Sequence, residues 1–145
     1  MEQNVLRMLE AMIGTTDDEE IKSDLRRHKL ETEQHVERIQ RRLEAHDASP
    51  SMVREAGGIM AALMKGAVDM VRNEKAGRNA RDGYATEAME IASYQLLERI
   101  AREAGDSETA EAARLNRLDE EKMARTIEQN WQKFAELSIK EGVSA

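Results

Sequence analysis

The sequence predicts an all-α protein, a four-helix bundle of two antiparallel helix pairs joined by a long, partly helical crossover. Apolar residues recur at helical spacing along most of the chain, and no segment alternates between apolar and polar residues as a strand would. Glycine, proline and capping residues divide this pattern into separate segments. The 145 residues suit one domain, residues 1–145, and a hydrophobic content of 40% can supply its core.

The first half of the chain contains two predicted helices. A short one has Val5 and Leu9 on its apolar face and is closed by Gly14. Thr16, followed three residues later by Glu19, is typical of a capping box and opens a long helix that extends to about residue 46. The apolar stripe of this long helix consists of Ile21, Leu25, Val36, Ile39 and Leu43.

The second half begins with the predicted crossover. A Ser-Pro pair opens a helical segment at about residues 51–74, and the basic, glycine-containing residues 75–83 are expected to form a loop. The next helix spans about residues 84–104 and is ended by Gly105. The last helix is capped at residue 106 or 107 and runs to about residue 140.

Composition limits the functions that this bundle can have. A net charge of −7 provides no basic face for a phosphate backbone, so we expect no nucleic-acid partner. The chain has no cysteine, so any metal must be held by nitrogen and oxygen ligands. There is no apolar run of membrane-spanning length and no signal-peptide pattern, so we expect a cytoplasmic protein without membrane contact.

All three histidines lie on the apolar face of the long second helix. His28, His35 and His46 project close to the centre of the stripe, as does Thr32. Glu31 lies at the border of the stripe, three residues after His28 and four before His35, so it can share a site with either. Either these histidines are hydrogen-bonded core residues, or they are metal ligands.

Carboxylates occupy the apolar faces of the other helices. Glu87 and Glu90 continue the stripe that contains Tyr94, whose hydroxyl could donate a hydrogen bond to a ligand. Burial of ionised carboxylates requires a compensating partner, either a basic side chain or a metal ion. Glu120 falls near the buried side of the last helix, although acidic runs such as this one are usually solvated. Glu2 lies on the apolar face of the first helix.

This inventory of carboxylates and imidazoles is what a dinuclear bundle site requires. Hard carboxylates can bridge two cations, imidazole completes each coordination shell, and open positions can admit dioxygen or peroxide. The sequence therefore predicts two bound divalent transition metals, iron in the first place and manganese or zinc as alternatives.

Three strings resemble the ferritin-like bacterial stress-protein family of the YciE/YciF type: HKLETEQHVERI (28–39), KAGRNARDGYATEAMEIASYQLLERIA (75–101) and LDEEKMA (118–124). The resemblance covers nearly the whole chain, and MEQNVLRML (1–9) resembles the first metal-bearing helix of that family. It implies a dinuclear site whose ligands are Glu2, His28 or His35, Glu31, Glu87, Glu90 and Glu120. Two positions depart from the pattern. Ala88 stands where relatives often have histidine, and Met123 stands where ferritins and rubrerythrins have the histidine of Glu-x-x-His.

Two function classes remain open at this stage. In the first, a reduced dinuclear centre reacts with dioxygen or peroxide in a stress or metal-handling role, with Glu31 and a carboxylate of a later helix bridging the metals. Whether such a chain is an enzyme, of the ferroxidase or peroxide-scavenging type, is left open. In the second, the bundle is a non-catalytic interaction or structural protein with a degenerate metal site, which Ala88 favours. A homodimer is expected from the short first helix and from the apolar segment Ile59–Met64.

Overall fold

The computed structural model describes residues 1–48 and 76–143, and 91% of these residues are helical, with no strand among them. The described helices are α1 (Glu2–Thr15), α2 (Glu19–Ala45), α5 (Ala76–Glu103), α6 (Ser107–Gln129) and α7 (Trp131–Val143). The predicted all-α class is confirmed. The helical segment predicted at about residues 51–74, which includes the apolar segment Ile59–Met64, lies outside the described residues.

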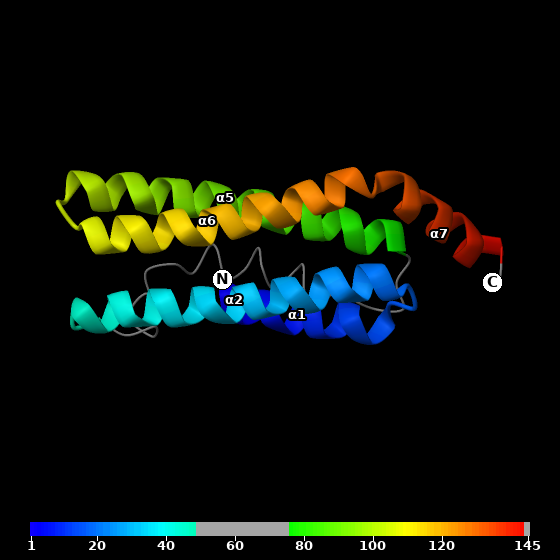
Figure 1. Cartoon of the computed structure of the whole chain (residues 1–145), viewed down its shortest axis with the longest axis horizontal. Coiled ribbons are helices and arrows are strands. Elements are labelled where there is room, and N and C mark those ends of the chain that lie inside the picture. Colours follow the sequence, from blue (N-terminus) through cyan, green and yellow to red (C-terminus); the bar gives the residue numbers. More distant parts are fainter. Residues whose placement is uncertain (49–75, 144–145) are drawn as a thin grey trace.

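The helices form two antiparallel pairs that lie one above the other (Figure 1). α1 packs against α2, α5 packs against α6, and the two pairs meet where α2 contacts α6. α7 continues from α6 after a bend and packs against the beginning of α5. α2 and α5 run in the same direction, as a long crossover between two pairs requires, so the predicted bundle of two antiparallel pairs is confirmed.

The start of α2 differs from the prediction. Its N-cap is Asp18, whose carboxylate accepts hydrogen bonds from the amides of Glu20 (3.1 Å) and Ile21 (3.0 Å). Thr16 instead ends α1, where its amide donates to the carbonyl of Met12 at 3.0 Å. The predicted capping box was therefore wrong, because the first helix continues past Gly14 and leaves only two residues between it and Asp18.

Two other boundaries also differ. Residues 76–83, predicted as a loop, form the first two turns of α5, because Ala80 and Gly83 are buried on the same face as the later core residues. Burial here outweighs the low helix propensity of glycine. The last predicted helix is divided at Asn130, whose amide donates to the carbonyl of Ile127 at 3.0 Å. Gly105 does end α5, with φ = 75°.

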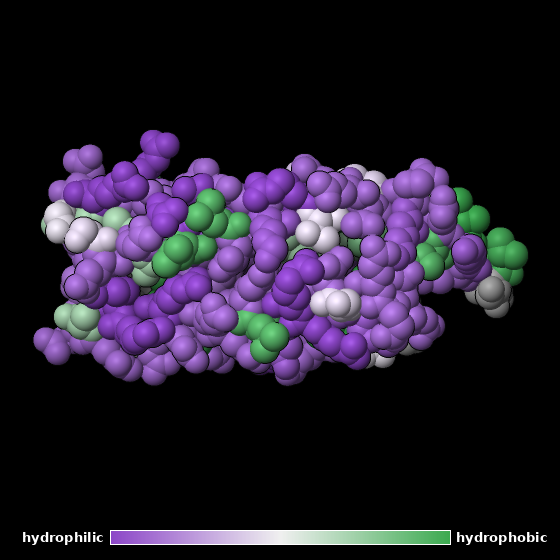
Figure 2. All heavy atoms as spheres, in the orientation of Figure 1, coloured by the Kyte–Doolittle hydropathy of each residue, from purple (hydrophilic) through white to green (hydrophobic). Residues whose placement is uncertain are grey.

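The apolar core lies between the two pairs and extends from the middle of the bundle toward α7. Its buried members are Val5, Met8, Leu9, Met12, Leu25, Ala80, Met123, Ile127 and Phe134. Figure 2 shows that the viewed face is largely hydrophilic, with small separate apolar areas. Within the described ranges, no helix combines the length and the apolarity needed to cross a membrane.

Candidate metal centre

Polar side chains interrupt the apolar stripe of each of the four main helices at the middle of the bundle. On α1 the stripe places Glu2 three residues before Val5, and on α6 it places Glu120 three residues before Met123. Such spacing puts the polar and the apolar side chains on one helix face, so the same packing buries both. Among residues 1–48 and 76–143, nine polar residues are buried: Glu2, His28, Thr32, His35, Thr86, Glu87, Glu90, Asn116 and Glu120.

Two groups of three ligand-type side chains meet in this region, and Glu120 belongs to both. The first cluster consists of Glu2, His35 and Glu120, and the second consists of His28, Glu87 and Glu120. In each cluster, one oxygen or nitrogen atom per residue lies within 4.8 Å of the other two. The two carboxylate oxygens of Glu120 contact different histidines, so this side chain is placed to bridge two neighbouring positions.

His35 is held between the first cluster and a carboxylate outside it. Its Nδ1 lies 2.9 Å from Oε1 of Glu120 and 3.7 Å from Oε2 of Glu2. Its Nε2 lies 3.1 Å from Oδ2 of Asp119. Asp119 therefore orients the ring so that Nδ1 faces the cluster, an arrangement typical of histidines that bind metals.

His28 has the corresponding arrangement in the second cluster. Its Nε2 lies 3.4 Å from oxygens of both Glu87 and Glu120, and its Nδ1 lies 3.4 Å from Oε2 of Glu31. The adjacent Thr32 is not free for the site, because its hydroxyl donates to the carbonyl of His28 at 2.9 Å. Each histidine thus presents one nitrogen to a cluster and the other to an outer carboxylate.

Glu90 lies fully buried among the carboxylates of both clusters. Neither of its oxygens has a hydrogen-bond partner among the described residues. Burial, followed by the negative charges of Glu2, Glu120 and Glu87, raises the pKa of Glu90 well above its usual value. Without a cation, this carboxyl is therefore held in its protonated form.

The pKa values of the cluster residues show how closely their charges are coupled. Burial opposes the charged form of His28, but the hydrogen bond to Glu31 and the close contact with the carboxylate of Glu87 outweigh burial and raise its pKa to about 10. His35 behaves in the same way, with Glu120 and Glu2 raising its pKa to about 9. Burial raises the pKa of Glu120 to about 8, although its contact with His35 acts in the opposite direction.

The donor atoms that face one another have no hydrogen bonds. Within the described part of the chain, the unpartnered buried atoms include Oε2 of Glu2, Nε2 of His28, Nδ1 of His35, Oε2 of Glu87 and both oxygens of Glu90 and Glu120. The imidazole–carboxylate contacts lie within ion-pair distance but lack hydrogen-bond geometry. Buried polar groups almost always find partners. Carboxylate oxygens and imidazole nitrogens directed at common points are a donor set that fits divalent transition metals.

Basic side chains lie outside this set and contact the outer carboxylates. Lys122 donates a hydrogen bond to Glu31, and together with His28 it outweighs burial and lowers the pKa of Glu31 to about 2. Arg38 contacts Asp119 at 3.3 Å and donates to Oδ1 of Asn116 at 2.9 Å. Among the described residues, the arginine and lysine side chains near the site therefore pair with the outer carboxylates and with none of the inner ones.

Tyr94 closes the site beside the first cluster. Its hydroxyl donates a hydrogen bond to Oε1 of Glu2, which leaves Oε2 of that carboxylate directed at His35. The tyrosine ring lies edge-on to the imidazole of His35, with ring centroids 6.1 Å apart. The expectation that Tyr94 can donate to a site carboxylate is confirmed, and the carboxylate is that of Glu2.

A family model described as a domain of unknown function, DUF892, matches residues 1–139. The chain belongs to the DUF892 family. This family is ferritin-like, in agreement with the two antiparallel helix pairs of the structure. No solved structure was found to match the chain.

In this DUF892 chain, the structure brings together most of the residues singled out from the sequence. Glu2, His28, His35, Glu87 and Glu120 form the two clusters, and Glu90 lies against them. Glu31 lies outside both clusters, where its carboxylate contacts His28 and Lys122. His46, expected on the core face, has a side chain 57% exposed and contacts Asp106 instead.

Other DUF892 site residues were missed or misjudged from the sequence. Ala88, which favoured a degenerate site, is exposed and so does not face the clusters. Three residues that contact the site were not selected from the sequence, namely Asp119, Asn116 and Arg38. Asp119 lies one residue before Glu120, and Asn116 lies four residues before it. The spacing of Asn116 on the buried stripe was a usable signal, whereas the contact of Arg38 depends on how α2 and α6 pack.

Proposed function

We propose that this chain binds two divalent transition metals in the interior of its bundle, as a cytoplasmic ferritin-like protein of the YciE/YciF type. The observation that carries the proposal is the set of buried, unpartnered donor atoms that face one another in the two clusters, with the buried and unpartnered carboxylate of Glu90 near them; the clusters consist of Glu2, His28, His35, Glu87 and Glu120. Within residues 1–48 and 76–143, no arginine or lysine pairs with any of these four carboxylates.

Charge supports two ions of this kind. Four inner carboxylates carry four negative charges when they are ionised, and two divalent cations carry four positive charges. Burial of unpaired carboxylates costs several kcal/mol for each ion, so the site favours cations that neutralise all four. One ion would take His35 and Glu2, the other would take His28 and Glu87, and both would share Glu120.

The residues around the proposed metals have separate tasks. Asp119 and Glu31 hold the two imidazoles in the tautomers that leave His35 Nδ1 and His28 Nε2 free to bind. Tyr94 fixes the orientation of Glu2 through its hydroxyl. Iron is the first choice of metal, with manganese or zinc as alternatives, and reduced iron or manganese would supply electrons to dioxygen or peroxide. We propose that this chemistry serves a stress or metal-handling role.

Elemental analysis tests the proposal directly. Protein purified without chelator is expected to contain about two transition-metal ions per chain, in keeping with the paired clusters. Glu90→Ala is expected to lose one or both ions, because it removes a carboxylate that faces both clusters. Glu121→Ala is the matched control, because Glu121 pairs with Arg117 and Arg125 outside the site.

The alternative is a non-catalytic bundle with a degenerate site. Equal and negligible metal contents in the parent and both variants would support that alternative and contradict the proposal. Equal, full contents in Glu90→Ala and Glu121→Ala would instead show that the metals bind elsewhere on the chain.

A further inference from the structure

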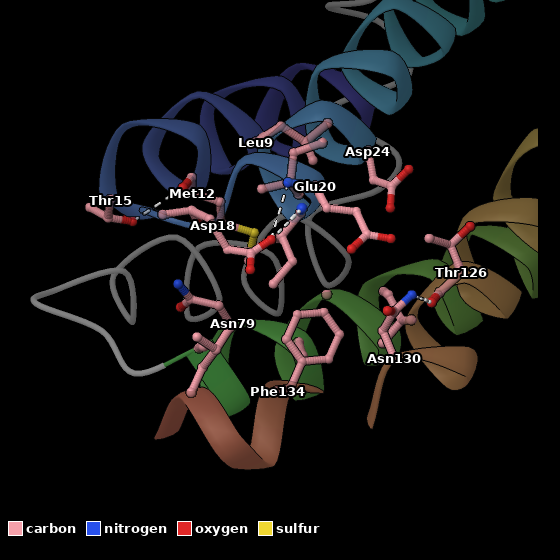
Figure 3. A pocket seen from close by; sticks show the side chains of 18 of the residues that line it. Leu9, Met12, Thr15, Asp18, Glu20, Asp24, Asn79, Thr126, Asn130 and Phe134 are labelled. Carbon is pink, nitrogen blue, oxygen red and sulfur yellow. Dashed lines mark hydrogen bonds between the residues drawn. The ribbon is translucent and has the colours of Figure 1, made fainter. Parts of the chain in front are cut away.

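A cavity of about 190 Å³ lies next to the candidate metal centre, between the α1–α2 pair and helices α5, α6 and α7 (Figure 3). Among the described residues, its apolar lining includes Met8, Leu9, Met12, Leu25, Met123 and Phe134. In Figure 3, Leu9 and Met12 face it from the side of α1, and Phe134 faces it from the opposite side. Five helices thus contribute to one largely apolar, partly open space.

The hollow exists because α5 presents small residues to it. Ala80 and Gly83 line the cavity one turn apart, where larger side chains would fill the space. The next turn carries Glu87, which also lines the cavity, is 1% exposed, and has an oxygen without a hydrogen-bond partner. A concave, largely apolar space with a few polar groups in its wall is the usual form of a small-molecule site, so this space indicates an occupant.

The lining defines the chemistry of that occupant. Three methionines and a phenylalanine provide an adaptable apolar wall. Among the acidic groups that line the cavity, Asp18 and Glu20 already contact Lys133, and Asp24 contacts Arg27, so these three carboxylates do not require a further cation. The same acidic groups disfavour an anion. The size lies above the 150 Å³ of a cavity that accepts benzene and below that of pockets for drug-sized ligands.

We propose that this cavity binds a small, uncharged, largely apolar molecule about the size of an alkyl-substituted benzene. Binding requires only the cavity, whereas the position of the molecule beside metal ions rests on the proposed function. Glu87 belongs both to the cavity wall and to the cluster with His28 and Glu120, so the inner end of the molecule lies next to that cluster.

Methyl NMR of protein labelled at its methionine methyl groups tests the proposal with n-butylbenzene as the probe. A titration is expected to shift the methyl signals of Met8, Met12 and Met123 in a saturable manner, and to show magnetisation transfer from the probe to these methyls. The signal of Met1, which is 36% exposed and does not line the cavity, should remain unchanged. Absence of saturable shifts, or transfer to other methyls only, would overturn the proposal.

A matched pair of variants on α5 makes the test specific. Ala80→Leu places a larger side chain in the cavity and is expected to weaken probe binding on the order of tenfold or more. Ala88→Leu makes the same change at an exposed position of the same helix and should bind like the parent. Equal binding by the two folded variants would contradict the proposal, and the transfer experiment on the parent decides the matter if Ala80→Leu does not fold.

The metal-free protein separates this proposal from the proposed function. Probe binding by the parent without metals, and by Glu90→Ala, would support the cavity as a ligand site even if the chain bound no transition metal. Two bound metals without any saturable methyl shift would leave the metal centre supported and refute the ligand site.

Discussion

Raising the pH of the metal-free protein is expected to destabilise it across the neutral range, and divalent metal should reverse this trend. Glu120 titrates near 4.5 when unfolded and at about 8 when folded, so the folded state holds a proton that the unfolded state has lost. The pKa values of His28 and His35 rise from 6.5 to about 10 and about 9. The stability that these three groups contribute is therefore present at mildly acidic pH. It is lost as the pH rises from the unfolded-state pKa of each group to its folded-state pKa.

The size of the effect follows from Glu120 alone. A difference of one in pKa corresponds to about 1.4 kcal/mol, so a rise from 4.5 to about 8 corresponds to a loss of roughly 5 kcal/mol across that interval. His35 and Glu120 share one contact, so their contributions are counted once. Against a total stability of about 5–15 kcal/mol, this loss is large enough to measure.

Urea unfolding followed by circular dichroism, from about pH 5 to about pH 8, measures this change. Without metal, the free energy of unfolding should fall as the pH rises. With zinc, which is redox-inert, it should fall less or rise, because the ligands must lose their protons to bind a cation. Glu120→Gln removes the titrating carboxyl and should flatten the metal-free profile, whereas Glu121→Gln should leave its slope unchanged.

The reasoning would be refuted by a metal-free stability that is constant or rises over this range. Equal slopes for Glu120→Gln and Glu121→Gln would also contradict the prediction, since Glu120 would then make no contribution to the pH dependence.

Four further substitutions test separate parts of the structure. Asp119→Ala removes the carboxylate that orients a site histidine, and it should weaken metal binding about 10–100-fold in competition with a chelator; unchanged affinity would exclude that role. Tyr94→Phe leaves Oε1 of Glu2 without its hydrogen bond and should lower the stability of the metal-free protein by about 1–3 kcal/mol in urea unfolding. Gly105→Ala should lower the free energy of unfolding by about 1–2 kcal/mol, because φ at this position is 75°. Gly14→Ala should raise it by about 0.5–1 kcal/mol in the same assay, because Gly14 lies in α1 with open space around it.

Helical periodicity was sufficient to predict the main helices, because each carries a continuous apolar stripe. The boundaries that failed depended on competition between neighbouring signals. Thr16 and Asp18 are both good N-caps, and only the path of the preceding turn decides between them. Ala80 and Gly83 read as loop residues because propensity carries no information about the helices that later cover them.

The inner site was more predictable than its surroundings for a similar reason. Glu90 and Glu120 lie on apolar stripes, so sequence spacing alone places them inside. Glu31 lies at the edge of its stripe, where a small rotation of α2 decides whether it faces the clusters or Lys122. The pairing of Arg38 with Asp119 joins residues 81 positions apart, and no local pattern records it.

Met123 connects the candidate metal centre with the cavity. It stands three residues after Glu120, where the Glu-x-x-His pattern has a ligand histidine. In this structure both imidazoles come from α2, with His28 in one cluster and His35 in the other, so the proposed centre needs no histidine from α6. Position 123 is thereby free to be apolar, and its side chain, 6% exposed, forms part of the cavity wall. Placing both histidines on α2 therefore allows an apolar ligand site directly beside the proposed metals.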